Sequence, residues 1–277
     1  MVMYRFLGFF ILTGLVLSGA RFYADGLSMG YYIMRCPMAD NIVKSTVNNA
    51  FRSDPSLAAG LLRMHFHDCF VEGVVSCADI LAMAARDAVF FAGGPYYEIP
   101  KGRKDGRRSK IEDTIRLPAP FLNSTELIRS FGQRGFNAQE MVALSGAHTL
   151  GVARCSSFKN RLKNFDSTND VDPALDSNFA KTLQNTCSAG DKTEVAFDAT
   201  SNSFDNAYYN ALQRKAGLLT SDQTLFTNPR TRNIVNAYAM NQAMFFLDFN
   251  PVMVKMGLLD VKEGNNGEVR QDCRKIN

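Results

Sequence analysis

The stretch from Ser76 to Ala92 constrains the fold more than any other part of the sequence. It is rich in alanine, leucine, methionine, valine and phenylalanine, and a Gly-Gly-Pro sequence at 93–95 follows it. Ser76, with Asp79 three residues later, is a capping pair typical of a helix start. The stretch therefore predicts a helix that is apolar on most of its faces and lies at the centre of a packed protein.

Similar signals predict further helices. Asp54 as N-cap and Pro55 at the first helical position introduce the segment SLAAGLLRMHFHDCF. Apolar residues at helical spacing or start and stop signals predict helices at Ala39–Phe51, Thr125–Phe131, Ala138–Thr149 behind an Asn137 cap, Asp205–Lys215, Pro229–Tyr238 and Ala243–Met256, where Pro251 marks a kink or the true start. No alternating ladder of Val, Ile and Thr competes, so we predict an all-α fold.

The first 26 residues have the pattern of a secretory signal peptide. Arg5 precedes an apolar core from Phe6 to Leu17, and small residues follow at 18–20. This run is too short to cross a hydrocarbon core of ~30 Å as a helix, which disfavours a membrane anchor. The remaining chain, 27–277, has no Pro/Ser-rich linker, and the whole chain has a globular composition, 46% hydrophobic and 21% charged. We predict a signal peptide at 1–26 and one exported domain at 27–277.

Export places the cysteines in an oxidising compartment, where disulfides are the default. There are six, at Cys36, Cys69, Cys77, Cys155, Cys187 and Cys273, and no CxxC pair indicates a zinc site. The net charge of +4 is spread along the chain without a basic stripe interleaved with aromatics. A nucleic-acid-binding function is therefore disfavoured.

The chain has three histidines, which limits its acid-base and metal chemistry. On a helix His65 and His67 point roughly 200° apart, so they do not form a chelating pair. His67 instead shares a face with Arg63, four residues earlier. An imidazole beside a guanidinium suits a reaction in which a proton moves and negative charge appears on oxygen, although a surface His-Arg pair would give the same spacing.

His148 follows an apolar helical segment and has small neighbours, Gly146, Ala147 and Gly151. Small neighbours allow a flat group to approach closely. A lone histidine on such a helix is also commonly a structural group, unless a cofactor binds its ring nitrogen.

Two sequence motifs give these histidines a family context. RMHFHDCFVEG resembles the distal signature of the plant secretory, or class III, haem peroxidases, and LSGAHTLGVARC resembles their proximal signature. The similarity also covers GRKDGRRS, LPAPF, FDNAYY, GLLTSDQTLF and GEVRQDCRKIN, which is nearly all of the chain after the signal peptide. The absence of tryptophan, with Phe66 at the distal aromatic position, agrees with the secreted class.

The resemblance implies the all-α haem-peroxidase fold, with haem b between a distal and a proximal half. It also implies oxidation of small phenolic donors by hydrogen peroxide. His148 then matches the axial ligand of the iron, and Asp222 the carboxylate that accepts its other ring proton. His67 matches the distal base and Arg63 the group that stabilises the developing charge. Pro118 matches the residue at the donor's entry edge.

The resemblance further implies calcium sites, which hard oxygen ligands would form. The proximal site would comprise Thr149, Asp198, Asp205 and a hydroxyl from either Thr200 or Ser201. The distal site would begin with Asp68 and the carbonyls of Val71 and Gly73.

The chain departs from the family after HFHDCFVEG. Family members continue with a CD-x-S stretch, a variable loop and a further helix, whereas here Val74 follows Gly73 and leads directly into VVSCADIL. The distal half would thus lack one helix and the rest of its calcium loop, as an omitted exon or an errant gene model would produce. The asparagine partner of the distal base would also be lost, with an expected cost of 10- to 100-fold or more.

Matching the cysteines to the family pattern implies Cys77–Cys273 and Cys155–Cys187 bridges and leaves Cys36 and Cys69 without their partners. Cys36 and Cys69 could bond each other if their Cα atoms lay roughly 4.4 to 6.8 Å apart. The resemblance implies a monomer, secreted to the extracellular space or cell wall, with the vacuole as another destination. A second hypothesis is an inactive or poorly folded secreted remnant, and a third is a disulfide-stabilised protein without a cofactor. Asn123 starts a glycosylation sequon and is equally suited to cap a helix.

Overall fold

The computed structural model describes residues 26–67, 75–108, 110, 112 and 117–277, and of residues 64–67 it describes only the backbone. The described chain is helical almost throughout, as the sequence predicts. The helices are α1 (Ala39–Ser53), α2 (Leu57–His67), α3 (Cys77–Phe91), α4 (Ser124–Gly132), α5 (Ala138–Ser145), α6 (Ser177–Cys187), α7 (Ala207–Gln213), α8 (Thr220–Thr227), α9 (Pro229–Met240) and α10 (Gln242–Met256). None of these helices is long and apolar enough to cross a bilayer.

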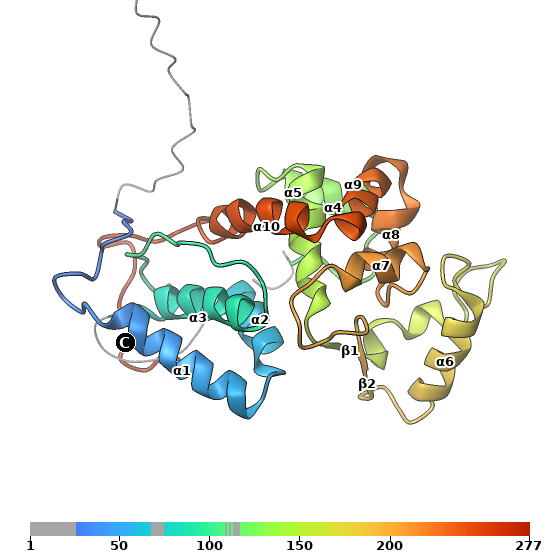
Figure 1. Ribbon diagram of the computed structural model, residues 1–277, viewed down its shortest axis with the longest axis horizontal. Helices are drawn as coiled ribbons and strands as arrows, with labels where there is room; N and C mark the ends of the chain where they lie inside the picture. Colours follow the sequence, from blue (N-terminus) through green and yellow to red (C-terminus); the bar gives the residue numbers. More distant parts are fainter. Residues whose placement is uncertain (1–25, 68–74, 109, 111, 113–116) are drawn as a thin grey trace, which may run out of the picture.

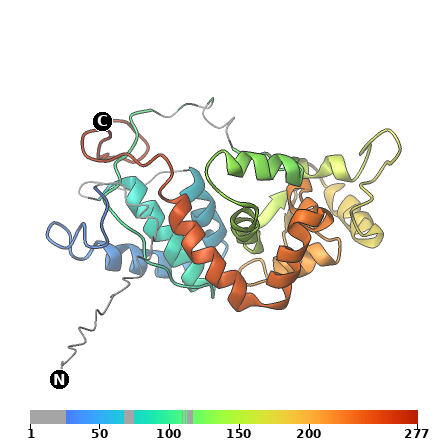
Figure 2. The same cartoon turned by 90° about the horizontal axis from the view of Figure 1, so that it is seen from above.

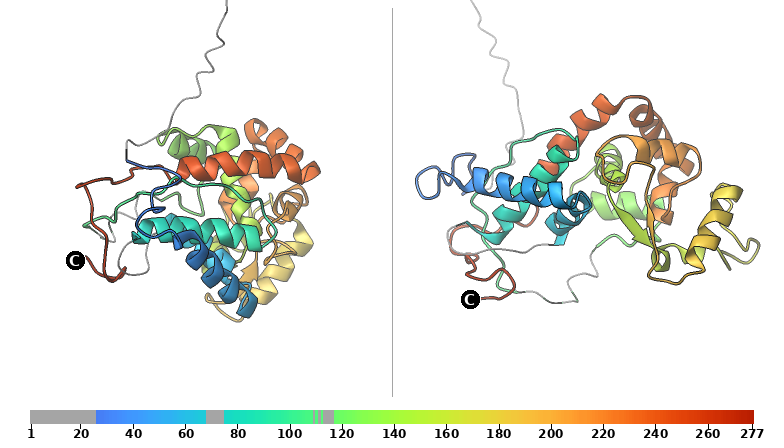
Figure 3. Two further views of the ribbon diagram at one scale, coloured as in Figure 1. Left: turned by 60° about the vertical axis from the view of Figure 1, so that its left-hand side comes forward. Right: turned by 60° about the horizontal axis from the view of Figure 1, so that its bottom comes forward.

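The helices form two groups. Helices α1, α2 and α3 pack together on one side, and α4 to α9 form the other (Figure 1). Helix α10 runs from the second group back toward the first, and Figures 2 and 3 show it between them from other directions. The segment after α10 then returns to the side of α1 and α3, where the chain ends.

Helix α3 is central to its group, as its composition predicts. Most of its residues between Cys77 and Val89 are buried, and they include a charged pair, Arg86 and Asp87. The Ser76 hydroxyl accepts a hydrogen bond from the backbone N–H of Asp79, which caps the helix. The side chain of Asp79 does not complete a reciprocal capping box. It accepts instead from the Tyr32 hydroxyl at 2.7 Å and bonds Arg103 at 3.0 Å.

Three differences from the sequence prediction concern the second group. Helices α6 and α8 were not predicted, because α6 buries only Ala180 and Leu183 and α8 has eight residues. A short antiparallel pair also forms, with β1 (Val152–Arg154) opposite β2 (Glu194–Ala196). Three-residue strands are too short to give a detectable alternation.

Other differences concern helix ends. The helix predicted through Thr149 ends at Ser145 and continues as a 3₁₀ turn over Gly146–Thr149. Helix α10 starts at Gln242 behind an Asn241 cap, so Pro251 lies inside it rather than at its start. The side chain of Asn123 caps α4 by accepting from the backbone N–H groups of Thr125 and Glu126.

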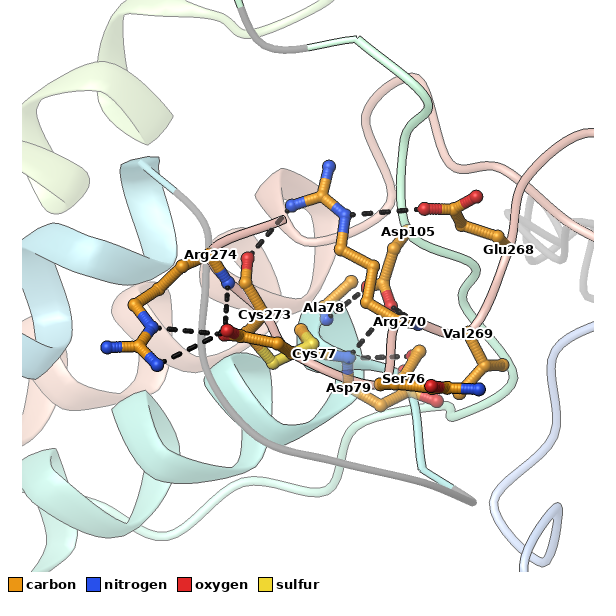
Figure 4. Close-up of a disulfide and its surroundings, with 12 residues drawn as sticks. Ser76, Cys77, Ala78, Asp79, Asp105, Glu268, Val269, Arg270, Cys273 and Arg274 are labelled. Carbon is orange, nitrogen blue, oxygen red and sulfur yellow. Dashed lines mark hydrogen bonds and ion pairs between the residues drawn. A yellow bond between two sulfur atoms is a disulfide. The ribbon is translucent and has the colours of Figure 1, made fainter. Parts of the chain in front are cut away.

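The N-terminus of α3 is tied to the C-terminal segment (Figure 4). A disulfide joins Cys77 to Cys273. Beside it, the buried Asp105 carboxylate accepts backbone hydrogen bonds from Cys77, Ala78 and Arg270. A carboxylate is favoured at this helix N-terminus, because it satisfies otherwise unpaired N–H groups and faces the positive end of the helix dipole. Three segments far apart in the sequence are thereby held together.

Candidate active site

His148 and Asp222 form the best-defined polar pair of the predicted site. The Nδ1 atom of His148 lies 2.7 Å from Oδ1 of Asp222, across 74 residues of sequence. Asp222 is buried, with a 2% exposed side chain, whereas the His148 side chain is 39% exposed. Since a carboxylate only accepts hydrogen bonds, Nδ1 of His148 is the donor in this pair, and in the neutral imidazole Nε2 then keeps its lone pair. Among the described residues none hydrogen-bonds Nε2, so this nitrogen is available to a ligand.

The Asp222 carboxylate is held by further donors. The Tyr208 hydroxyl donates to Oδ1 at 3.0 Å, and the backbone N–H of Leu219 donates to Oδ2 at 3.1 Å. The chain before α8 is fixed by the buried Arg161, whose guanidinium bonds Asp172 at 2.8 Å and the carbonyls of residues 217–219. These contacts set the orientation of the His148 ring through its partner.

Aromatic rings enclose His148. The Phe197 ring stacks on it with centroids 4.5 Å apart and planes within 8°, and the Tyr208 ring meets it edge-on at 6.0 Å. Burial, and next the charge of Asp222, raise the pKa of Tyr208 well above its ordinary value, so this hydroxyl stays protonated and donates. The resemblance to the plant haem peroxidases implies an aromatic ring at Phe197 near the proximal histidine, and the structure has this contact, whereas the resemblance gave no role to Tyr208.

This arrangement fits a haem iron ligand. An imidazole that is partly open to its surroundings and hydrogen-bonded through Nδ1 to a buried carboxylate matches the ligand set of a haem site, in which the carboxylate raises the basicity of the ligand. The glycines near His148 also bring protein segments close together. A Cβ at Gly146 would overlap the Tyr209 hydroxyl and the Phe245 ring, and one at Gly151, where φ is +89°, would lie 2.6 Å from Ala59 of α2. These two glycines allow protein elements to approach each other.

Four side chains of the predicted proximal calcium site converge. The Thr149 hydroxyl lies 2.7 Å from Oδ2 of Asp198 and 3.1 Å from Oδ1 of Asp205. The Thr200 hydroxyl lies 3.2 Å from Asp198 and 3.1 Å from Asp205. Ser201 contributes its carbonyl to the backbone N–H of Gly151 instead. The structure therefore favours Thr200 over Ser201 as the source of the second hydroxyl.

The electrostatics of this cluster suit a cation. Burial, and also the nearby Asp205 charge, raise the pKa of Asp198, although hydrogen bonds from Thr149 and Thr200 act in the opposite direction. Within the described residues, no group of three or more His, Cys, Asp or Glu side chains could hold a metal ion. This set has two carboxylates and draws its other side-chain oxygens from threonine, a composition that hard cations accept.

The distal residues are only partly described. Arg63 and His67 both lie on α2, four residues apart and hence on one face, and Arg63 is exposed. The side chain of His67 lies outside the described residues, as do Asp68, Cys69, Val71 and Gly73. Pro118 is half-buried in a loop whose neighbour Pro120 accepts a hydrogen bond from the backbone N–H of Ser221, next to Asp222.

Both cysteine pairs implied by the resemblance are bonded in the structure, Cys77 to Cys273 and Cys155 to Cys187. Cys36 is half-buried and forms no disulfide with the cysteines that the structure describes.

Comparison with known proteins identifies the family. The family model for peroxidases matches residues 43–74 and 71–241. The chain is 59% identical over 303 residues to Peroxidase 47 of Arabidopsis thaliana, covering 94% of this chain and 91% of the relative. It is 40% identical over 309 residues to Peroxidase 64 of the same plant, covering 95% and 96%. Peroxidase N1 of Nicotiana tabacum is 38% identical over 318 residues, with coverage of 97% and 96%.

The chain therefore belongs to the peroxidase family, among the plant class III haem peroxidases. It has the helical fold of these enzymes, and membership implies a haem peroxidase that uses hydrogen peroxide and a reducing donor. The family also implies haem and, usually, calcium as cofactors.

Proposed function

We propose that this chain is a secreted, monomeric peroxidase that binds haem b through His148 and oxidises small phenolic donors. The observation that carries the proposal is the His148–Asp222 pair with Nε2 left free. Bound haem would supply the iron at which the oxygen–oxygen bond of hydrogen peroxide breaks. Asp222 would hold the proton on Nδ1 and increase the negative character of the imidazole.

On the opposite face of the haem, the residues of α2 would handle the proton and the charge. His67 would take a proton from hydrogen peroxide and return it to the departing oxygen. Arg63 would stabilise negative charge on that oxygen. A donor would approach near Pro118. Residues 1–26 would direct export as a signal peptide, and 27–277 would form the single domain.

A deletion in the distal half would impair this activity. The match to the family model is split into two parts that overlap at residues 71–74, and the alignment with Peroxidase 47 extends over 303 residues although the chain has 277. Both findings support a missing segment after Gly73. Its loss would remove the partner of the His67 ring and part of the distal calcium site, beyond Asp68, Val71 and Gly73.

A specific observation favours the second candidate function, a secreted remnant with little or no turnover. Large apolar side chains are exposed on both sides of Cys36, at Met29, Ile33, Met34, Met38 and Ile42, with Met34 91% exposed. Exposed apolar groups of this kind invite aggregation or the binding of a partner. Exposed apolar side chains are expected on a surface whose covering segment is missing.

Restoring the segment separates the two candidates. The chain and a variant carrying the corresponding segment of Peroxidase 47 would be expressed for secretion with haem, and their haem absorption spectra and rates of phenol oxidation measured. We expect haem bound in both and a rate in the restored variant higher by about 10- to 100-fold or more. Equal, high rates would contradict the impairment. A haem spectrum without turnover in the unrestored chain would select the remnant.

Calcium removal tests the proximal site. We expect a chelator to lower the melting temperature, because a bound ion at 100 times its dissociation constant stabilises the fold by about 2.7 kcal/mol. In Thr200→Val, which keeps the shape but removes the hydroxyl, the chelator should have a much smaller effect. The matched variant Ser201→Ala should respond like the unmodified protein. A full response in Thr200→Val and a lost one in Ser201→Ala would assign the ligand to Ser201.

A further inference from the structure

A series of tyrosine rings leads away from His148. The Tyr208 ring lies 6.0 Å from the His148 ring between centroids, Tyr209 lies 5.1 Å from Tyr208, and Tyr238 lies 5.2 Å from Tyr209. All three tyrosines are buried. Neighbouring rings in contact, each with an oxidisable phenol, form a path along which single electrons can move in short steps.

The outer end of the series differs from its middle. The Tyr238 hydroxyl donates to Oδ2 of Asp248 at 2.6 Å, so its proton has a carboxylate to move to when an electron is withdrawn. The Tyr209 hydroxyl donates to the carbonyl of Val142, which is not a base of comparable strength. Tyr208 also donates to a carboxylate oxygen, Oδ1 of Asp222, but that oxygen is already bonded to Nδ1 of His148 and is the weaker proton acceptor. Loss of an electron from the series is therefore best stabilised at Tyr238.

The Tyr238–Asp248 pair lies close to the surface. Asp248 is half-buried, and its other partner is the side chain of Gln139, an exposed residue at 2.8 Å. Leu247 and Met244, on the same helix α10, are also exposed. A donor resting on this corner of α9 and α10 could contact the half-buried Asp248, the hydrogen-bond partner of Tyr238.

We propose that Tyr208, Tyr209 and Tyr238 form an electron relay from the α9–α10 corner to the haem side of His148, through which phenolic groups on polymers too large to reach the haem are oxidised. The relay rests on the proposed function, since haem oxidised by hydrogen peroxide supplies the oxidant. One electron leaves the series toward the haem, the O–H bond of Tyr238 breaks, and its proton moves to Asp248. A phenol at the surface then supplies one electron, Asp248 returns the proton to Tyr238, and the donor releases its own proton to water as a phenoxyl radical.

The first test detects the tyrosyl radical directly. The haem-loaded protein would be mixed with one equivalent of hydrogen peroxide without donor, frozen, and measured by electron paramagnetic resonance. We expect a tyrosyl signal that Tyr238→Phe and Tyr209→Phe both lose. Tyr97→Phe is the matched control, because Tyr97 is buried but makes no ring contact with the series among the described residues. Asp248→Asn, which keeps the tyrosine and removes the base, should diminish the signal.

The second test compares donors of two sizes, a free phenol and the same phenol attached to dextran. In Tyr238→Phe we expect oxidation of the dextran-bound phenol to fall by about tenfold or more and that of the free phenol to change by less than about twofold. An unchanged radical in Tyr238→Phe, its loss in Tyr97→Phe, or an equal fall for both donors would overturn the relay. If the haem spectrum does not respond to hydrogen peroxide in any variant, the proposed function fails together with the relay.

Discussion

Replacing His148 by alanine is expected to abolish haem retention and peroxidase turnover. His148 presents a free Nε2 beside a 39% exposed ring surface, and its Nδ1 proton is already committed to Asp222. Alanine removes the proposed iron ligand and leaves Tyr208 and Leu219 as the partners of the buried carboxylate among the described residues. The measurement is the haem absorption spectrum after gel filtration, together with the rate of phenol oxidation.

Two matched carboxylate variants distinguish the binding of haem iron by His148 from the effect of the Asp222 charge on that ligand. Asp222→Asn keeps the size of the side chain and removes its charge, so haem should remain bound while the rate falls about 10- to 100-fold. Asp87→Asn makes the same change at a buried aspartate of α3, where Arg86 retains Asp40 as a second partner. Its rate should be close to that of the unmodified protein. Haem bound normally by His148→Ala would refute the assignment of the axial ligand.

Removing the Cys77–Cys273 disulfide is expected to cost about 5 kcal/mol of unfolding free energy, because the bridge closes a loop of 196 residues. Natural domains have a total stability of about 5–15 kcal/mol, so the double variant Cys77→Ala, Cys273→Ala should lose a large part of its stability. We expect it to be mostly unfolded at 37 °C. Thermal and urea unfolding, followed by circular dichroism, would measure the loss.

The second disulfide provides the comparison. Cys155 and Cys187 are 32 residues apart, which corresponds to about 4 kcal/mol in the same chain-entropy treatment. The double variant Cys155→Ala, Cys187→Ala should therefore be destabilised somewhat less than the first. The reverse order would mean that native contacts, such as those around Asp105, rather than loop length, determine the contribution of each bridge.

The fold was largely predictable because its helices carry local signals. Helix α3 combines an apolar run with the Ser76 cap and a glycine stop, and these features act within a few residues of sequence. Helices α6 and α8 were missed because their stability comes from tertiary partners. Asp222 caps α8 and at the same time bonds His148, so the feature that orders this helix is visible only in three dimensions.

The candidate site was likewise predictable only in part, where a motif or the family resemblance indicated the residue. The motif containing His148 and the resemblance to haem peroxidases indicated Asp222 and Phe197, and the structure brings both against the ring. Neither Tyr208 nor Arg161 was singled out. Tyr208 belongs to FDNAYY, which was noted only as part of the resemblance, and the contacts of Arg161 with residues 217–219 connect segments that no local pattern relates. The roles of the distal residues Arg63 and His67 stay predictions.

The ties between α3 and the end of the chain bear on how the protein is made. A chain is synthesised from its N-terminus, so α1, α2 and α3 leave the ribosome long before Arg270 and Cys273 exist to complete their surroundings. The Cys77–Cys273 disulfide and the contacts of Arg270 with Asp105 can therefore form only after the final residues are released. A premature stop codon before Arg270 would thus disturb the half of the molecule that is made first, far from the altered codon.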